Sequence, residues 1–340
     1  MTHRTRGLAV ALTAVLAASL TACGLSGGSS DALVVYNAQH ESLTREWAEE
    51  FTAETGIDVE LRNGSDFDLG NQLVAEGDAS GADLYLTENS PAISMVAREG
   101  LLAPVSEETL TQVPEEYRPS SGDWVGIAAR STVFVYNQDA VAEDELPRSF
   151  ADLASPRWKG KWGAAPAGAD FQAIVSASLD LAGEDATRTW LESLRGPDGK
   201  TATYKGNKPI LAAVNSGELD GGVIYHYYYF GDQAGTGESS QNVVQHYFRN
   251  GGPESFVSLS GGGVLADAPH AEDAQRFLAF ITSKKGQEIL RDSSFEYPVA
   301  SGVEANPELV PLAELNAPAV DPSGLNGPEV TDLMISLGLA

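Results

Sequence analysis

Residues 33–61 read LVVYNAQHESLTREWAEEFTAETGIDVEL, and their pattern sets the architecture of the chain. The segment begins with an apolar run at 33–36 and ends with alternating apolar and polar residues at 57–61, and both patterns are typical of strands. Between them, residues 43–54 place apolar side chains at helical spacing. A strand, a helix and a strand in this order predict parallel strands covered by a helix.

The same alternation continues along the chain and predicts an α/β protein with two lobes. Further strands are predicted at 83–86, 132–136, 161–165, 221–225 and 257–265. Further helices are predicted at 69–76, 91–99, 170–181, 186–194, 271–282, 284–291 and 328–337. We expect each lobe to be a mixed sheet flanked by helices, with a hinge where the chain crosses between the lobes. Ligands of such proteins bind beyond the carboxyl ends of strands, and the hinge closes around them.

Length and charge narrow the classes of function. A chain of 340 residues is long for one compact domain and suits two. Its 21 basic and 48 acidic residues give a formal net charge of -27. Nucleic acid is excluded as an expected partner, because polyphosphate binding needs a basic surface.

The first thirty residues are typical of a secreted lipoprotein. Arg4 and Arg6 precede a short apolar stretch at 8–20, as in a signal peptide, which we place at 1–22. The sequence Leu20-Thr21-Ala22-Cys23 resembles a bacterial lipobox, and Cys23 is the only cysteine. Residues 23–30 then form a lipidated tether on the extracytoplasmic side of the cell membrane. The alternative is an ordinary cleaved signal with an incidental cysteine.

Two longer stretches resemble the solute-binding proteins of ABC importers. These are LPRSFADLASPRWKGKWG at 146–163 and FLAFITSKKGQ at 277–287. Three shorter stretches that follow predicted strands are similar to the bacterial ferric-ion-binding proteins: VYNAQH at 35–40, LTENSPA at 86–92 and IYHYYY at 224–229. The resemblance spans nearly all of residues 33–337.

This resemblance implies a fold, a cargo and partners. The fold is the two-lobed, type II periplasmic-binding-protein fold, with residues 31–129 and 260–309 in the first lobe and 130–259 and 310–340 in the second. The cargo is ferric iron, held in the cleft between the lobes by four side chains: His40, Glu88, Tyr227 and Tyr228. The partners are the permease and ATPase subunits of an ABC importer, and we expect a monomer that is not an enzyme.

The chemistry of these four residues suits ferric iron. Ferric ion is a hard acid and favours anionic oxygen donors over thiolates. Two phenolates and one carboxylate neutralise its charge, and a neutral imidazole adds a fourth donor. Adjacent residues of a strand point to opposite faces, so Tyr227 and Tyr228 share one ligand only where the chain turns, as at a strand-to-helix junction.

A second group of residues is placed near the metal, where four protein ligands leave about two positions in an octahedral shell. Water or a synergistic anion, carbonate or phosphate, is expected there. The candidates to contact the anion or to support the ligands are Arg130, Gly168, Ala169, Asn207, Tyr225 and His226. The family's Asn before the tyrosine pair and its Thr-Ser-Gly turn are replaced here, by Tyr225-His226 and by PAGAD at 166–170. These departures leave the identity of the anion open.

Two alternative functions remain, one with the same fold and one in a different class of protein. The same fold could bind a polyamine, thiamine or a phosphonate, through carboxylates and aromatics or through helix N-termini. A secreted lipoprotein enzyme is the remaining class, but the chain has no His-Glu-x-x-His helix and no phosphate loop. His40 alone fits an ordinary loop residue, and Glu88 alone fits an acid at a helix N-terminus. Their joint occurrence at strand ends favours the metal site.

Overall fold

The computed structural model describes residues 32–339. The predicted signal peptide at 1–22, the tether at 23–30 and Cys23 lie outside these residues. The strands in the described range are β1 (Leu33–Asn37), β2 (Val59–Asn63), β3 (Leu84–Thr87), β4 (Val125–Asn137), β5 (Trp162–Gly163), β6 (Gly221–Tyr225), β7 (Val243–His246) and β8 (Val257–Val264).

Helices follow most strands. They are α1 (Glu41–Thr55), α2 (Asp66–Glu76), α3 (Ser90–Arg98), α4 (Glu107–Gln112), α5 (Phe150–Leu153), α6 (Ala169–Ala182), α7 (Glu184–Glu192), α8 (Asn207–Asn215), α9 (Tyr227–Ala234), α10 (Ala271–Thr282), α11 (Lys284–Ser294) and α12 (Gly327–Leu337). Short 3-10 turns are η1 (Gly77–Ala79), η2 (Glu115–Tyr117), η3 (Glu143–Glu145), η4 (Pro253–Ser255), η5 (Leu312–Glu314) and η6 (Pro322–Gly324). The sequence patterns did not predict the helices α4, α5, α8 and α9 or the strand β7.

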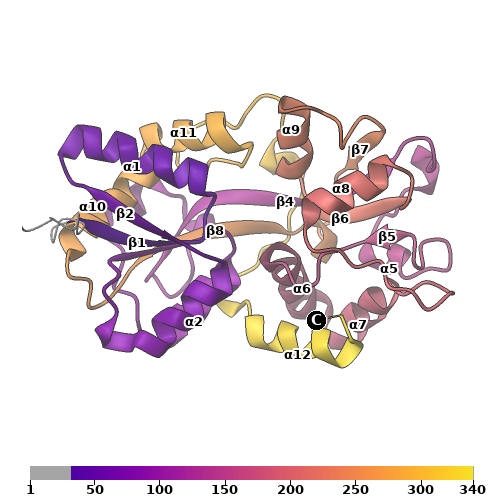
Figure 1. The fold of residues 1–340 in the computed structure, drawn as a ribbon, viewed down its shortest axis with the longest axis horizontal. Helices are drawn as coiled ribbons and strands as arrows, with labels where there is room; N and C mark the ends of the chain where they lie inside the picture. The colour runs from indigo at the N-terminus through magenta and orange to yellow at the C-terminus, as the bar shows by residue number, and fades with distance from the viewer. Residues whose placement is uncertain (1–31, 340) are drawn as a thin grey trace, which may run out of the picture. The chain divides into compact units, whose positions relative to one another are not determined.

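The strands pair in the order β2-β1-β3-β8-β4-β6-β5, with β7 also paired to β4. The first three are parallel, as predicted, whereas β8 runs antiparallel to both β3 and β4. Strand β4 serves two sheets, because residues 125–131 pair with β8 and residues 132–136 pair with β6. Figure 1 shows β4 and β8 running between the group of elements around β1 and the group around β6.

Apolar side chains form separate cores on the two sides of this crossing. One core takes its residues from 33–129 and 259–315, and a second takes them from 134–256 and 325–334. This distribution is compatible with two lobes, and the exact lobe boundaries near 130, 260 and 310 stay a prediction. The predicted α/β architecture is confirmed, because helices flank sheets built from these strands.

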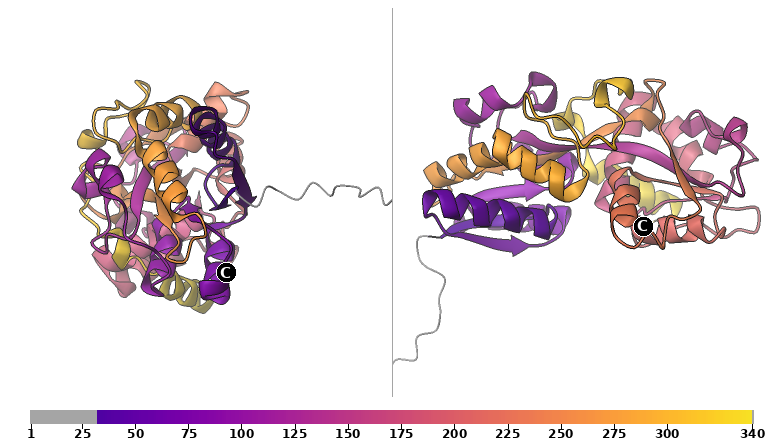
Figure 2. Two further views of the ribbon diagram at one scale, coloured as in Figure 1. Left: turned by 90° about the vertical axis from the view of Figure 1, so that its left-hand side faces the viewer. Right: turned by 90° about the horizontal axis from the view of Figure 1, so that it is seen from above.

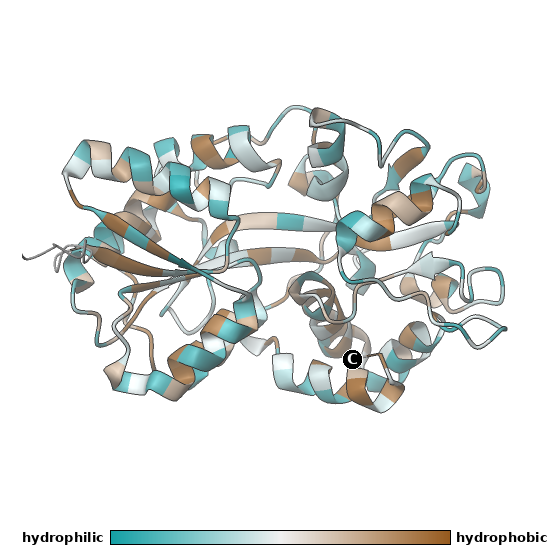
Figure 3. Cartoon of the chain, in the orientation of Figure 1, coloured by the Kyte–Doolittle hydropathy of each residue, from teal (hydrophilic) through white to brown (hydrophobic). Residues whose placement is uncertain are grey.

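Local sequence explains how α1 sits against its sheet. Its buried face carries Leu43, Trp47 and Phe51, and the Trp47 indole donates a 2.8 Å hydrogen bond to the carbonyl of Gly286 in α11. The helix ends at Gly56, whose φ of 74° is the left-handed value that glycine adopts without strain. Figure 2 shows α1 beside α10 and α11, and Figure 3 shows the contrast between hydrophobic β1 and the mixed surface of α2.

Glycines in β8 let helices pack directly on the sheet. A Cβ atom at Gly261 would lie 2.7 Å from Cγ2 of Ile93 in α3, and one at Gly262 would lie 2.7 Å from Cδ1 of Leu278 in α10. Both contacts are shorter than side chains tolerate, so the GGG run at 261–263 is required by close packing. Within residues 32–339, no helix has both the length and the hydrophobicity needed to span a bilayer.

Candidate functional site

His40 is placed by the loop between β1 and α1. The Asn37 side chain closes this loop, since its amide donates to the carbonyl of Gln39 at 2.9 Å and its oxygen accepts from the Gln39 N–H at 3.1 Å. The Gln39 side-chain oxygen then accepts the backbone N–H of His40 at 2.7 Å. These bonds fix the backbone at the carboxyl end of β1 and leave the imidazole partly exposed, at 27%.

Glu88 is placed by the turn between β3 and α3. Both oxygens of the buried Asp66 carboxylate accept backbone bonds from this turn, at 2.8 Å from the N–H of Glu88 and at 3.0 Å from that of Asn89. The Glu88 carboxylate Oε1 lies 2.8 Å from Nδ1 of His40. The two predicted ligands that follow β1 and β3 are therefore in direct contact, because parallel neighbouring strands end at the same edge of a sheet.

Tyr227 and Tyr228 lie at the junction predicted for them. Strand β6 ends at Tyr225 and α9 begins at Tyr227, so the turn brings both rings to one side, with centroids 4.2 Å apart. The Tyr227 ring also packs edge-on against His40, at 5.2 Å between centroids. The structure thus brings all four predicted ligands into one contiguous group. Three of them, His40, Tyr227 and Tyr228, line a pocket of about 570 Å³.

A fifth side chain, the carboxylate of Asp170, joins this group as its fourth oxygen donor and was not among the predicted ligands. Its buried carboxylate accepts hydrogen bonds from Tyr228 at 2.8 Å and from Tyr227 at 3.4 Å. It also accepts from the side-chain amides of Asn207 at 2.7 Å and Asn89 at 2.8 Å. An acid in the first turn of a helix normally needs no explanation beyond the helix dipole, so no sequence signal indicated that Asp170 faces the tyrosines.

Burial and neighbouring charges tune the acidity of these groups. Burial, together with the charge of Asp170, raises the pKa of both Tyr227 and Tyr228 well above the ordinary value of 10. Burial raises the pKa of Asp170 as well, and the charge of Glu88 adds to the increase. Burial alone would raise the pKa of Glu88, but the hydrogen bond with His40 and the charge of Arg130 lower it overall.

Arg130 connects the two loops that carry His40 and Glu88 by hydrogen bonds. The guanidinium is fully buried and donates from Nε to Oε1 of Glu296 at 2.6 Å. It also donates to the side chain of Gln39 at 3.1 Å and to the backbone carbonyl of Glu88. Its charged carbon lies 5.6 Å from the centroid of the Tyr227 ring, within range of a cation–π interaction. Arg130 is therefore a buried cation at the site and not an exposed charge at a strand edge.

Of the remaining residues predicted to contact an anion or to support the ligands, all but His226 lie around Asp170 and Asn89. Gly168 precedes α6 and Ala169 begins it, directly before Asp170, and Asn207 begins α8 with its amide on Asp170. Tyr225 donates to Asn89 at 3.4 Å.

His226 is fully buried and links backbone segments. Its Nδ1 accepts the N–H of Ser131 at 3.2 Å, and its Nε2 donates to the carbonyl of Phe295 at 2.8 Å. Both ring nitrogens are thus engaged by backbone groups. Burial lowers the pKa of His226 to about 3, so the ring is neutral at physiological pH.

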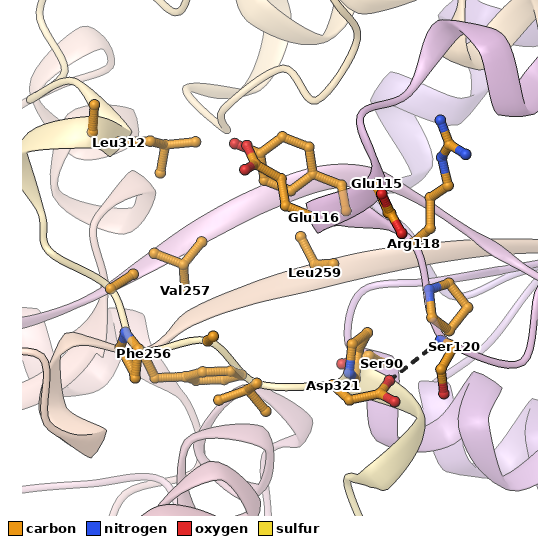
Figure 4. A pocket seen from close by; sticks show the side chains of 18 of the residues that line it. Ser90, Glu115, Glu116, Arg118, Ser120, Phe256, Val257, Leu259, Leu312 and Asp321 are labelled. Atoms are coloured by element: carbon orange, nitrogen blue, oxygen red, sulfur yellow. Dashed lines mark hydrogen bonds between the residues drawn. The ribbon is translucent and has the colours of Figure 1, made fainter.

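A larger cavity of about 1020 Å³ lies elsewhere, near the crossing of β4 and β8. Figure 4 shows Phe256, Val257 and Leu259 on its walls, and Ser120 bonded to Asp321 at its edge. None of its lining residues borders the pocket beside the tyrosines. Among residues 32–339, no group of three or more His, Cys, Asp or Glu side chains is arranged to hold a metal ion without other ligands.

The chain is similar over most of its length to proteins of one known family. Residues 79–322 match the family model described as bacterial extracellular solute-binding protein. The chain is 54% identical over 329 residues to the Fe(3+)-binding periplasmic protein of Serratia marcescens, covering 96% of each chain. It is 33% identical over 329 residues to the major ferric iron-binding protein of Neisseria meningitidis serogroup B, covering 96% of this chain and 98% of the relative.

A solved structure extends the comparison to three dimensions. The crystal structure of iron-bound HitA from Pseudomonas aeruginosa superimposes with a TM-score of 0.84 at 36% identity. The match covers 91% of this chain and 99% of that chain.

Proposed function

This chain belongs to the bacterial extracellular solute-binding proteins, in the branch of the ferric iron-binding periplasmic proteins, and we propose that it captures one ferric ion through His40, Glu88, Tyr227 and Tyr228. As a member of a binding-protein family, it is not an enzyme. It acts outside the cytoplasm and passes iron to the permease and ATPase of an ABC importer.

The observation that carries the ligand assignment is the contact chain from Glu88 through His40 to the tyrosine pair. Glu88 lies 2.8 Å from His40, His40 packs edge-on against Tyr227, and the rings of Tyr227 and Tyr228 pack against each other at a tilt. These side chains come from three strand ends that are far apart in sequence. One carboxylate and two phenolates match the three charges of ferric ion, and hard oxygen donors are the ligands that such an ion favours. The same four side chains are less complementary to a polyamine or a phosphonate.

Asp170 is proposed as a further ligand that takes the place of a synergistic anion. Its carboxylate already contacts both tyrosine hydroxyls, which is where carbonate or phosphate is expected to meet the metal. With Asp170 ionised, the ligands carry four negative charges, one more than ferric ion neutralises. The buried Arg130 lies beside the Tyr227 ring, but its charge is already paired with Glu296. Water then completes the shell, and iron binding needs no added anion.

A lipid anchor at Cys23 is the proposed means of attachment to the membrane. Its support is the lipobox-like Leu20-Thr21-Ala22-Cys23 and the uniqueness of the cysteine. A monomer held in this way keeps its binding site on the extracytoplasmic side.

Metal analysis with a visible spectrum tests the proposal. Purified protein mixed with ferric citrate is expected to bind one iron per chain and to show a red band from phenolate-to-iron charge transfer. Tyr227→Phe and Tyr228→Phe should each weaken iron binding by more than about 100-fold, since even partners that only support a metal ligand are worth 10–100-fold. Tyr229→Phe, the adjacent residue of α9, is the matched control and should keep both band and affinity. A wild-type protein that stays colourless would refute the iron assignment.

A further inference from the structure

Glu296 is a fully buried carboxylate whose two oxygens have different surroundings. Oε1 lies 2.6 Å from both Nε and Nη2 of Arg130. Oε2 is buried and accepts no hydrogen bond from any of residues 32–339. Leaving a buried carboxylate oxygen unsatisfied is costly, and such an atom in a native protein calls for a specific explanation. Pairing with Arg130 accounts for Oε1 only.

Oε2 faces the imidazole of His40. It lies 3.9 Å from Nε2 of His40, while the other nitrogen, Nδ1, lies 2.8 Å from Glu88. The ring therefore stands between two carboxylates, one at each nitrogen. The 3.9 Å separation is about 1 Å longer than a hydrogen bond between nitrogen and oxygen, so a small rotation of the ring would complete the bond.

The backbone holds Glu296 rigidly in this place. Tyr297, the next residue, exchanges two 2.9 Å backbone hydrogen bonds with Ala129, the neighbour of Arg130 in β4. Phe295, the preceding residue, has a φ of 57°. A bulky residue in the left-handed region is strained, and such strain gathers at functional sites. Phe295 is also the left-handed C-cap that ends α11, so the end of this helix and the pairing with Ala129 together fix Glu296 with Oε2 beside His40.

We propose that Glu296 is the positioning residue for His40. Its Oε2 accepts a hydrogen bond from Nε2–H of His40 when Nδ1 of His40 and the Glu88 carboxylate bind ferric iron. Histidines that bind metals usually donate their second N–H to a carboxylate or carbonyl, which fixes the tautomer and the ring orientation. Glu88 cannot serve in this way, because it is itself a proposed ligand. The inference rests on the proposed iron function and adds a residue that does not touch the metal.

A double-mutant cycle tests whether Glu296 acts through His40. Iron affinity is measured by competition with citrate, followed by the charge-transfer band, for the wild type, Glu296→Gln, His40→Ala and the double variant. Glu296→Gln keeps an oxygen for Arg130 and should weaken iron binding about 10–100-fold in the wild-type background. In the His40→Ala background it should have less than about a 2-fold effect.

A second readout reports the tautomer directly. In protein loaded with gallium(III), a diamagnetic substitute for ferric ion, the nitrogen-15 spectrum of His40 should show a protonated Nε2 in the wild type. Glu296→Gln should shift that resonance. If Glu296→Gln does not fold, Glu296→Asp, which keeps the charge but shortens the reach to His40, should give the same coupling.

The outcomes separate this inference from the proposed function. An equal loss of affinity in both backgrounds, or no loss in either, would overturn the role of Glu296 while the wild-type band upholds iron binding. A wild-type protein without the band would overturn the proposed function and this inference together.

Discussion

The hydroxyl of Tyr228 donates a 2.8 Å hydrogen bond to Oδ2 of Asp170, and the hydroxyl of Tyr227 lies 3.4 Å from the same oxygen. Both phenols therefore carry their protons in this structure and point them at one carboxylate. Binding of ferric iron as proposed replaces two protons by one metal ion at this carboxylate.

Iron binding should release protons and weaken in acid. Burial and the charge of Asp170 raise the pKa of Tyr227 and Tyr228 above 10, so at neutral pH the metal must displace both phenol protons. Each displaced proton changes the affinity about tenfold per pH unit, and the expected slope is therefore about two decades per unit. Acid titration of the charge-transfer band measures it. Loss of iron that does not depend on pH between about 8 and 6 would contradict phenolate ligation.

Replacing Asp170 should make iron binding depend on an added anion. Asp170→Asn keeps the size of the side chain but removes the negative charge that meets the tyrosine hydroxyls, and iron affinity should fall about 10–100-fold. Phosphate or carbonate should restore part of the loss in the variant and should leave the wild type unchanged. Asp180→Asn, an exposed position of the same helix, is the control. A wild type that requires the anion would place Asp170 outside the metal shell.

His226 should make the metal-free protein less stable in acid. Its pKa is about 3 in the folded protein, against an ordinary value of 6.5, because it is buried. At pH values between these two pKa values, His226 is protonated in the unfolded chain but not in the folded chain. The free energy of unfolding therefore falls as the pH drops from about 6.5 toward 3. The loss attributable to His226 between about pH 7 and 5 is about 2 kcal/mol. Urea unfolding at both pH values should show a smaller difference in His226→Gln, and an unchanged difference would refute this account.

Close packing on β8 should make Gly261 intolerant of a methyl group. A Cβ atom there would lie 2.7 Å from Ile93 and 3.1 Å from Trp124, so Gly261→Ala should lower the free energy of unfolding by about 1–3 kcal/mol. A Cβ atom at Gly81 would meet no neighbouring atom within 4 Å, and Gly81→Ala should be nearly neutral. Thermal unfolding of the two variants makes the comparison, and equal stability would show that β8 can shift to admit a side chain.

Removing the only cysteine should detach the protein from the membrane. Cys23→Ser leaves no thiol for lipidation, so the protein should move from the membrane fraction to the soluble fraction and lose labelling by radioactive palmitate. Iron binding by the purified variant should match that of the wild type, because the proposed ligands all lie between residues 40 and 228. A variant that stays in the membrane fraction would argue against the lipid anchor.

Short-range patterns were sufficient for most secondary structure. The strand at 33–36 and the helix at 43–54 appear as β1 and α1 with slightly longer bounds, because period-2 and period-3.6 patterns record which face is buried. Helix α9 was not predicted, since its aromatic start at 227–230 fits a strand as well as a helix.

The sequence alone identified the alternation of strands and helices, and with it the positions of His40, Glu88 and the tyrosine pair at strand ends. The strand ends follow from local backbone patterns, which a linear sequence contains, whereas the choice of these four residues as ligands came from the resemblance to the ferric-ion-binding proteins. Only the tertiary structure placed Asp170 on the tyrosines and Glu296 beside His40, although Glu296 is 256 residues beyond His40 in the chain. Hydrogen bonding and burial between such distant residues depend on how the strands pair and cross, and no local pattern encodes that arrangement.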